Sequence, residues 1–472
     1  MAENIAAAET KIKEEWSLNR LQGPYKSPPY LRFKACPLAI RQKSNGKHRL
    51  LHNLSFPYNE DAVNTRIPRE NYKVKFASIQ DAIDILKNKK GAYMAKTDIK
   101  DAFRILPIHE KDQHLLGFCF KGAYYFDRCL PMGCSSACKI FERISSAITH
   151  ILEKKYRVAN VVKYLDDFLF IGDTEEECLR ALASFEHLCG RLGIPIAKHK
   201  TEGPSKRMIF LGYQLDSEMG LISIPKTKIN NYAEQISSLL HADKTTLRET
   251  KSIIGKLLFV TNVVTIGRCF LRRLINLTCG KVHPASAIHL DTEVKEDLRL
   301  WLSFLKYYNG KHLMAQKPKV TSSSLHFFTD SCKRGYGGVF GRNHIRGLFP
   351  AAWRKLSIQV LELYPIYAML HLYGRFLANC EVVFYCDNKS VVYNINKQSS
   401  KNKFIMKMLR PIIMLLLKYN FSLKARHIKG KLNTVADRIS RGQVTPQFLR
   451  KRGMNPTPTP LPCHLRPQNF RL

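Results

Sequence analysis

Hydrophobic positions follow different periods in different parts of the chain. Between residues 31 and 217, short β-rich apolar runs alternate with segments of helical spacing, which predicts an α+β domain. Between residues 218 and 316 the apolar residues keep helical spacing, as Ile229 and Ile236 illustrate, and this predicts a mostly helical region. Residues 325–441 again alternate strand-like and helical runs, the order expected of a mixed α/β sheet.

The two ends of the chain and one internal stretch lack these patterns. Residues 1–30 form an N-terminal extension, with a helical stretch from Ala6 to Leu18 and then a turn-rich passage, so we expect the folded body to begin near Leu31. The polar stretch from Lys317 to Ser324 predicts a linker. Residues 442–472 contain six prolines and no acidic residue, which predicts a mobile, disordered basic tail.

The charge balance narrows the class of partner. Lys and Arg number 76 against 38 Asp and Glu, and the formal charge of +38 favours a polyanion such as nucleic acid. The longest aliphatic run, Ile412 to Leu417, is far shorter than the ~18 residues of a membrane span, and the N-terminus lacks the layout of a signal peptide. We therefore expect an intracellular protein, cytoplasmic or nuclear, that is not secreted and has no membrane partner. The 13 cysteines include no CxxC pair and predict reduced thiols rather than disulfides or a zinc site.

Three acidic residues of the first domain suit phosphoryl-transfer chemistry. Asp166 and Asp167 stand between two apolar β-prone runs, which predicts a hairpin with acids at its tip, and Asp98 ends another apolar strand. Two divalent ions ~3.5 to 4 Å apart need such carboxylates, so that one ion activates a hydroxyl and the other steadies a leaving pyrophosphate. Taken alone, a pair of acids in a turn is more often a solvated turn.

Five segments, in this order along the chain, resemble reverse transcriptases. Tyr164 to Asp167 resembles the YxDD box, and Asp98 to Phe103 resembles the DxxxAF segment. Leu130 to Phe141 is similar to the LPxGxxxSPxxF segment, and Phe210 to Leu215 is similar to the primer-grip hairpin. Arg41 to Ser55 looks like the fingers strands that hold the incoming triphosphate. The resemblance implies fingers and palm at residues 31–217.

The resemblance also implies a role for each matching residue. The acids that would carry the catalysis and bind two metal ions, Mg²⁺ or alternatively Mn²⁺, are Asp98, Asp166 and Asp167. Phe103 would exclude a ribose 2′-hydroxyl, and either Lys198 or Lys200 would protonate pyrophosphate. The other residues implied at the nucleotide are Lys43, Arg49, Met132, Gly133 and Tyr164. Those implied at the primer and template are Phe210, Leu211, Gly212 and Tyr213.

A second set of acids lies in the third domain, at strand ends and on helices. Its members are Asp330, Glu362, Asp387 and Asp437. Each alone is more often a strand-end or helix-cap acid than a ligand. As an ordered set, with His427 ten residues before Asp437, they resemble the four-acid site of ribonuclease H. That resemblance implies a second two-metal site, in which the four acids are metal ligands and, with His427, the catalytic residues that cut RNA paired to DNA.

The helical middle region, residues 218–316, would be the thumb and connection that grip the duplex. Its candidate phosphate contacts are Lys251, Lys256, Arg268, Arg272 and Arg273, although each is individually more often part of a solvated helix face. The segments from Gly23 to Pro57 and from Ile254 to Leu274 look most like DIRS-type retrotransposons, whose elements pair this polymerase with a tyrosine recombinase. A recombinase encoded elsewhere in the element is therefore an expected partner.

Together the resemblances imply an α+β fold class: a right-hand polymerase with a helical connection, followed by an α/β ribonuclease H-like domain at residues 325–441. The implied activity is an RNA- and DNA-directed DNA polymerase with ribonuclease H activity, and the implied partners are an RNA template, a DNA primer, their hybrid and dNTPs. The main alternative is a catalytically inactive, domesticated protein that coats nucleic acid through its charge. A third interpretation keeps the nuclease alone active. The sequence leaves the oligomeric state open.

Overall fold

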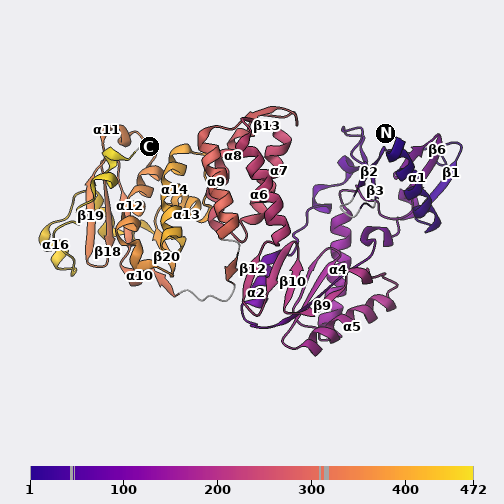
Figure 1. Cartoon of the computed structure of the whole chain (residues 1–472), viewed down its shortest axis with the longest axis horizontal. Coiled ribbons are helices and arrows are strands. Elements are labelled where there is room, and N and C mark those ends of the chain that lie inside the picture. The colour runs from indigo at the N-terminus through magenta and orange to yellow at the C-terminus, as the bar shows by residue number, and fades with distance from the viewer. Residues whose placement is uncertain (1, 43–45, 47, 308–309, 313–317, 471–472) are drawn as a thin grey trace. The chain divides into compact units, whose positions relative to one another are not determined.

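A computed structural model describes residues 2–42, 46, 48–307, 310–312 and 318–470 of the chain. The chain divides into two compact units (Figure 1). The first consists of Met1–Ile222 with His312–Met314, and the second of Ser223–Lys311 with Ala315–Leu472. Within the described ranges, none of the helices has the length and apolar character that crossing a membrane requires.

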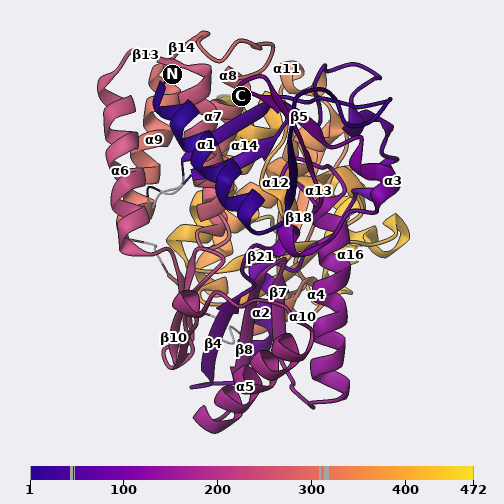
Figure 2. The ribbon, with the colours of Figure 1, turned by 90° about the vertical axis from the view of Figure 1, so that its right-hand side faces the viewer.

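A four-stranded antiparallel sheet forms the centre of the first unit. Its strands, in spatial order, are β7 (Val161–Tyr164), β8 (Asp167–Gly172), β4 (Tyr93–Asp98) and β9 (Glu202–Ser205). Helices α4 (Ala137–Lys154) and α5 (Glu175–Arg191) pack on this sheet (Figure 2). Phe141 of α4 and Phe185 of α5 meet Phe168 and Phe170 of β8 in one fully buried core, which holds the strand ends rigidly.

A second hairpin follows the central sheet, and further elements complete this part of the first unit. Strands β10 (Arg207–Phe210) and β11 (Tyr213–Asp216) pair antiparallel, with β12 (Leu221–Ser223) next to β11. Nζ of Lys96 in β4 donates to the carbonyl of Ile209 at 2.9 Å, which ties the hairpin to the sheet. The shorter helices of the unit are α2 (Ile79–Leu86) and α3 (Glu110–Gln113).

The N-terminal extension belongs to the folded body of the first unit. Helix α1 (Ala2–Ser17) is followed by β1 (Leu21–Tyr25), which pairs with β6 (Ala123–Asp127), and β6 pairs with β5 (Gly117–Phe120). Ile12 of α1 and Leu21 of β1 are buried against Phe118. The expectation that the folded body begins near Leu31 is therefore wrong, because β1 finds its partner strand about a hundred residues further along the chain. The two-stranded sheet of β2 (Leu38–Gln42) and β3 (His48–His52) completes this region.

The second unit begins with a helical bundle. Its helices are α6 (Lys226–His241), α7 (Leu247–Val260), α8 (Arg272–Leu277) and α9 (Thr292–Tyr307), and its small sheet is β13 (Lys244–Thr246) with β14 (Ala287–His289). Trp301 of α9 is fully buried, with Phe270 and Phe304 among the aromatic residues of the same core. Gly267 lies so close to the Trp301 ring that a Cβ there would approach it to 2.3 Å.

Within its described residues, the remainder of the second unit is an α/β structure built on six strands. Antiparallel strands β17 (Phe328–Ser331), β18 (Gly335–Phe340) and β19 (Asn343–Leu348) form one sheet, and parallel strands β16 (Lys319–Thr321), β20 (Glu381–Cys386) and β21 (Ser422–His427) form the other. The helices are α10 (Ser322–Leu325), α11 (Ala351–Arg354), α12 (Ile358–Tyr373), α13 (Lys389–Lys397), α14 (Lys403–Lys418) and α15 (Thr434–Ser440). Helix α12 is buried along most of its length, so its apolar residues cover all sides rather than one stripe.

The stretch expected to be a linker is structured where it is described. Val320 pairs with Val382 in the parallel sheet, and the buried hydroxyl of Ser322 accepts from the backbone N–H of Tyr385 at 2.8 Å. Lys317 lies outside the described residues. The linker prediction failed because polar composition describes the local stretch alone, whereas β16 is stabilised by a strand about sixty residues away.

The C-terminal segment also differs from the expected mobile tail. Residues 442–470 include α16 (Pro446–Arg450), and Val444, Leu449 and Met454 are buried with Val339 of β18. The hydroxyl of Tyr364 in α12 donates to the carbonyl of Leu465 at 2.8 Å. The segment cannot build a core of its own, but its scattered apolar residues bind to a core that the preceding strands and helices already form.

Candidate active sites

The first candidate site lies at the end of the central sheet of the first unit. Asp98 is the last residue of β4, and it is paired with Asp167, the first residue of β8. Asp166 lies in the tight turn between β7 and β8, and its carbonyl accepts from the backbone N–H of Ile99 at 3.0 Å. Leu165 in the same turn has a φ of 54°, so the chain reverses sharply before the two acids. The fold thus brings the three predicted acids together.

The carboxylates of the three acids interact electrostatically. Burial, together with the carboxylates of Asp166 and Asp98, raises the pKa of Asp167 to about 7. Burial and then Asp98 also raise the pKa of Asp166, while Lys200 and Arg49 act in the opposite direction. Carboxylate oxygens from three adjoining positions, one buried and two half-buried, are a donor set that suits Mg²⁺ or Mn²⁺, so Asp98, Asp166 and Asp167 fit the role of metal ligands.

The two lysines proposed as the proton donor differ in position. Both belong to a short 3₁₀ turn, Lys198–Lys200, and both are exposed. Nζ of Lys200 donates to Oδ2 of Asp98 at 2.8 Å. Lys200 therefore lies at the acids, which favours it over Lys198 for a role there.

The residues implied at the nucleotide come from several elements of the first unit. Phe103 lies in a 3₁₀ turn, Ala102–Ile105, and its ring packs edge-on against Phe141 at a centroid distance of 5.8 Å. Gly133 has a φ of 132°, and a Cβ there would approach the carbonyl of His52 to 1.9 Å, so only glycine fits. Three other members of this set are described. Arg49 is exposed on β3, and Met132 is half-buried. Tyr164 ends β7, and its ring lies beside that of Phe76. Lys43 lies outside the described residues.

The implied primer-binding residues form the tip of the β10–β11 hairpin. Phe210 and Tyr213 are buried and pair with each other across the two strands. Leu211 and Gly212 make the turn, with φ angles of 46° and 81°. The tip of the hairpin is therefore a tight two-residue turn that follows a buried pair of aromatic side chains.

The basic residues of the bundle that are proposed to contact phosphates differ in whether other side chains already engage their charged groups. Lys251 and Arg268 are exposed. Nζ of Lys256 donates to Gln235 at 2.6 Å, and Nε of Arg272 donates to Asn276 at 2.8 Å. Arg273 forms ion pairs with Glu293 and with Asp297, whose side chain is fully buried. The charge of Arg273 is therefore committed to the packing of the bundle.

The second candidate site lies in the α/β part of the second unit. Asp330 belongs to β17, Glu362 to α12 and Asp437 to α15, and Asp387 follows β20 directly. Ligand atoms of Glu362, Cys386 and Asp387 lie within 4.8 Å of one another. The carboxylates of Asp387 and Asp437 both act on the pKa of Asp330, which burial raises. The fold thus gathers the four acids from four separate elements.

Two buried oxygens of this second site lack hydrogen-bond partners within the described chain. Among the described residues, Oε2 of Glu362 and Oδ1 of Asp387 are buried acceptors without a partner. Burial, together with the charges of Asp330 and Asp387, raises the pKa of Glu362 to about 9. Unpaired buried acceptors are costly, and a divalent cation would satisfy them, so these residues fit the role of metal ligands. Asp330 accepts from the hydroxyl of Ser440, and Asp437 is paired with Arg441 at 2.7 Å.

Three further residues surround the second site. His427 is exposed at the end of β21, and its Nε2 lies 3.2 Å from the carbonyl of Asp387. Asn433 is buried and donates to the carbonyl of Thr329 at 3.0 Å, which is a structural role. Sequence reasoning missed Cys386, but burial raises the pKa of its thiol strongly, so it stays protonated and packs rather than binds Mg²⁺.

Sequence reasoning also missed a group of buried charges beside the nucleotide residues. Arg104 and Asp127 form an ion pair of 2.6 Å and are less than a tenth exposed. Asp127 also bonds His52 at 2.9 Å. A signal was present, because Arg104 interrupts the apolar run AFRILPI and Asp127 ends the apolar run AYYF.

Comparison with known proteins places these observations in context. Residues 41–215 match the sequence profile of the family described as reverse transcriptase (RNA-dependent DNA polymerase). The chain is 25% identical over 372 residues to the putative enzymatic polyprotein of Cassava vein mosaic virus, covering 76% of this chain and 54% of that polyprotein. It is 22% identical over 430 residues to the Transposon Tf2-3 polyprotein of Schizosaccharomyces pombe, covering 87% of this chain and 29% of that one. The chain thus spans about half of the first polyprotein and less of the second.

Solved structures with a similar fold include the foamy viral protease-reverse transcriptase. Its complex with double-stranded DNA gives a TM-score of 0.52 at 16% identity, covering 91% of this chain and 83% of that chain. Its complex with an RNA/DNA hybrid also gives 0.52 at 16% identity, covering 89% and 53%. The likeness concerns the fold, and it confirms the predicted α+β class of a right-hand polymerase. The reverse transcriptase match covers the first candidate site, with Asp98, Asp166 and Asp167 all inside it.

Proposed function

We propose that this chain is an RNA-directed DNA polymerase that also accepts DNA templates. The observation that carries the proposal is the coincidence of the reverse transcriptase match at residues 41–215 with a half-buried cluster of Asp98, Asp166 and Asp167. A carboxylate cluster of this kind is costly unless a cation binds to it, and nucleotidyl transfer requires such a site.

Each residue of the first site has a chemical task in this proposal. Asp98, Asp166 and Asp167 hold the divalent ions, which supply Lewis-acid stabilisation of the attacking hydroxyl and the leaving pyrophosphate when bound. Lys200, beside Asp98, donates a proton to the pyrophosphate oxygen that leaves. Arg49 adds positive charge for the triphosphate, and the ring of Phe103 occupies the space that a 2′-hydroxyl would need.

We further propose that the second site is a ribonuclease H that degrades the RNA strand of an RNA–DNA hybrid. The support is the convergence of Asp330, Glu362, Asp387 and Asp437 and the unpaired buried oxygens of Glu362 and Asp387. Mg²⁺ or Mn²⁺ held by these acids would supply the Lewis acid for hydrolysis of a phosphodiester. His427, exposed beside Asp387, is free to assist the departure of the product. A polymerase that copies RNA leaves a hybrid behind, and this nuclease would remove the used template.

The basic charge fits the same proposal. The formal charge of +38 suits an RNA template, a DNA primer and their duplex, with affinity that falls steeply as salt rises. Lys251 and Arg268, exposed on the helical bundle, are the candidates there for phosphate contacts. The relatives are polyproteins of viruses and of a transposon, so we assign the chain to the copying machinery of a retroelement that works inside cells, of DIRS type by its sequence, with a recombinase as a further partner.

The alternative is a nucleic-acid-binding protein without chemistry. Two observations argue against it. All the acids that the two reactions require are present, and they are brought together although carboxylate repulsion destabilises the fold. A protein that merely coats nucleic acid gains nothing from buried, unpaired carboxylate oxygens.

Extension of a DNA primer on a labelled RNA template, with dNTPs and Mg²⁺, tests the polymerase directly. We expect primer growth by the wild-type chain and none by Asp166→Asn, which keeps the size of the side chain but removes its charge. Asp173→Asn, at an exposed residue directly after β8, is the matched control and should extend normally. Tight binding of the primer–template without extension, with Mg²⁺ and with Mn²⁺, would favour the alternative.

A further inference from the structure

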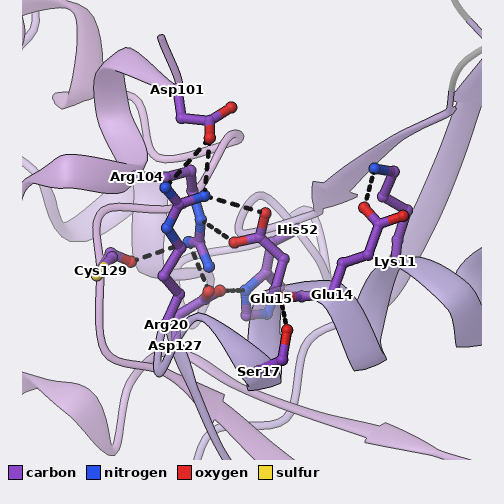
Figure 3. Close-up of polar contacts among 10 residues, drawn as sticks. All are labelled: Lys11, Glu14, Glu15, Ser17, Arg20, His52, Asp101, Arg104, Asp127 and Cys129. Atoms are coloured by element: carbon purple, nitrogen blue, oxygen red, sulfur yellow. Dashed lines mark hydrogen bonds and ion pairs between the residues drawn. The ribbon is translucent and has the colours of Figure 1, made fainter. Parts of the chain in front are cut away.

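The N-terminal helix α1 is joined by part-buried ion pairs to the turn that carries Phe103 (Figure 3). Oε2 of Glu15, near the end of α1, accepts from Nε of Arg104 at 2.8 Å. Oε1 of the same carboxylate lies 3.6 Å from Nη1 of Arg20. Arg104 follows Phe103 directly in the chain, so the extension reaches the residue next to the proposed sugar-selecting ring.

The two arginines hold both sides of this turn. Arg20 donates from Nη1 and Nη2 to Oδ2 of Asp101, at 3.1 Å each. Asp101 has a φ of 55°, a left-handed conformation that costs free energy in a residue with a Cβ. Its carbonyl accepts from the backbone N–H of Arg104 at 2.6 Å and starts the 3₁₀ turn Ala102–Ile105. Such a conformation persists because its surroundings hold it, and here Arg20 and Arg104 do so.

The group is balanced in charge. Arg104 also donates to Asp127, and Oδ2 of Asp127 lies 2.9 Å from Nδ1 of His52. Nε2 of His52 lies 3.0 Å from the carbonyl of Gly117, and because both partners only accept, both ring nitrogens carry protons. The cations of the group are Arg20, Arg104 and His52, and its anions are Glu15, Asp101 and Asp127. Loss of the charge on Glu15 would leave three cations with only two anions in this part-buried group.

The same group borders the residues implied at the nucleotide. A cavity of about 90 Å³ is lined by Arg49 and Met132 together with Glu15, Asp101 and Arg104. The backbone N–H of His52 donates to the carbonyl of Met132 at 3.0 Å. The charges that fix the Phe103 turn therefore also fix the backbone beside Met132.

We propose that Glu15 is a positioning residue of the nucleotide site, which holds the Asp101–Ile105 turn, and with it Phe103, in the geometry that selects deoxynucleotides. The inference rests on the polymerase function proposed above. Glu15 acts through Arg20 and Arg104 rather than by touching the nucleotide. Helix α1 is then part of the specificity machinery.

The test compares Glu15→Gln with Glu14→Gln in single-nucleotide extension by the full chain. Glu14 neighbours Glu15 on the same helix, but its side chain is half exposed and its ion pair is with Lys11, so it is the matched control. For Glu15→Gln we expect the KM for dNTP to rise and the preference for dNTP over rNTP to fall, each roughly tenfold, because a charge-assisted contact is lost. The kcat for dNTP should change by a smaller factor than the KM for dNTP. Glu15→Asp, which keeps the charge, should recover part of the preference.

Three outcomes decide the proposal. If Glu15→Gln matches Glu14→Gln in KM and in sugar preference, Glu15 contributes only to stability and the proposal is wrong, whatever the change in melting temperature. If Glu15→Gln does not fold, Arg20→Lys, which breaks the double contact to Asp101 at a partly exposed position, must give the same loss of sugar preference. If the wild-type chain extends no primer at all, the polymerase function itself has failed and this inference fails with it.

Discussion

Asp98 and Asp167 are paired residues of the neighbouring antiparallel strands β4 and β8, so two carboxylates stand directly opposite each other at one end of the central sheet. Opposite like charges destabilise a strand pair, and here Asp166 adds a third carboxylate from the adjoining turn. The sheet therefore carries an electrostatic cost at the place where the proposed function needs metal ligands.

Removal of one of these charges should stabilise the metal-free protein. We expect Asp167→Asn to raise the free energy of unfolding by roughly 1–3 kcal/mol at pH 8 in the presence of a chelator, because repulsion and the burial of a charge are both relieved. Urea titration measures the change. Asp173→Asn, an exposed residue of the same sheet region that is paired with Lys89, should give no such gain. A loss of stability in Asp167→Asn would show that the acids do not repel each other as the geometry implies.

Substitution of Phe103 should relax the choice of sugar. Phe103→Ala removes the ring that packs on Phe141, and we expect the preference for dNTP over rNTP to fall by roughly one to two orders of magnitude. Competing single-nucleotide incorporation measures this ratio. Phe103→Tyr retains the ring and should retain the preference. Unchanged discrimination in Phe103→Ala would mean that another residue reads the sugar.

The buried ion pair of His52 should make stability depend on pH. Burial alone would lower the pKa of His52, but the hydrogen bond and the charge of Asp127, together with interactions with Cys36, outweigh burial and raise the pKa to about 9. Because this value lies above the ordinary 6.5, the stabilisation is fully present below pH 6.5 and is lost as the pH rises through 9. The contribution amounts to about 3 kcal/mol.

Unfolding titrations at pH 6.5 and pH 9.5 measure this dependence. The free energy of unfolding should fall less between these two pH values in His52→Gln than in the wild-type chain, because glutamine has no proton to lose. His150→Gln, at the end of α4, is the control for histidine titration in general. If the wild-type chain and His52→Gln decline by the same amount, His52 is not the group that titrates.

The C-terminal segment should contribute to the stability of the second unit. We expect Leu465→Ala to lower the free energy of unfolding by roughly 2–5 kcal/mol, because the side chain is fully buried and its loss would leave a cavity. Leu432→Ala, at a position 65% exposed in the same unit, should change it by less than about 0.5 kcal/mol. Equal effects of the two substitutions in chemical unfolding would mean that residues 442–470 do not pack as described.

Local patterns were sufficient to predict the elements that carry the acids. Apolar runs on both sides of Asp166 and Asp167 predict a hairpin, and the structure has β7 and β8 there. Asp98 ends β4, as the pattern indicates. The chemistry of two metal ions suggested that Asp98 could meet the hairpin acids, and the resemblance turned this into an expectation, because strand pairing over such a separation leaves no local signal.

Interactions between distant segments account for what the sequence did not predict. The Glu15–Arg104 contact joins the N-terminal extension to residues almost ninety positions away, and neither residue type indicates its partner. Residues 442–470 are poor in apolar side chains, yet Leu449 and Leu465 are buried on surfaces that other elements provide. Composition describes what a segment can build alone, and it therefore misses packing on a neighbour.

The most direct test of two separate sites is one reaction that follows both strands of a primer–template. Asp166→Asn and Asp387→Asn are each given a DNA primer on a labelled RNA template with dNTPs and Mg²⁺. The account predicts that Asp166→Asn cuts the RNA where it is paired with the DNA primer but does not extend that primer. It predicts that Asp387→Asn extends the primer but does not cut the RNA. Loss of both activities in either variant, with the fold intact, would contradict the assignment of two independent sites.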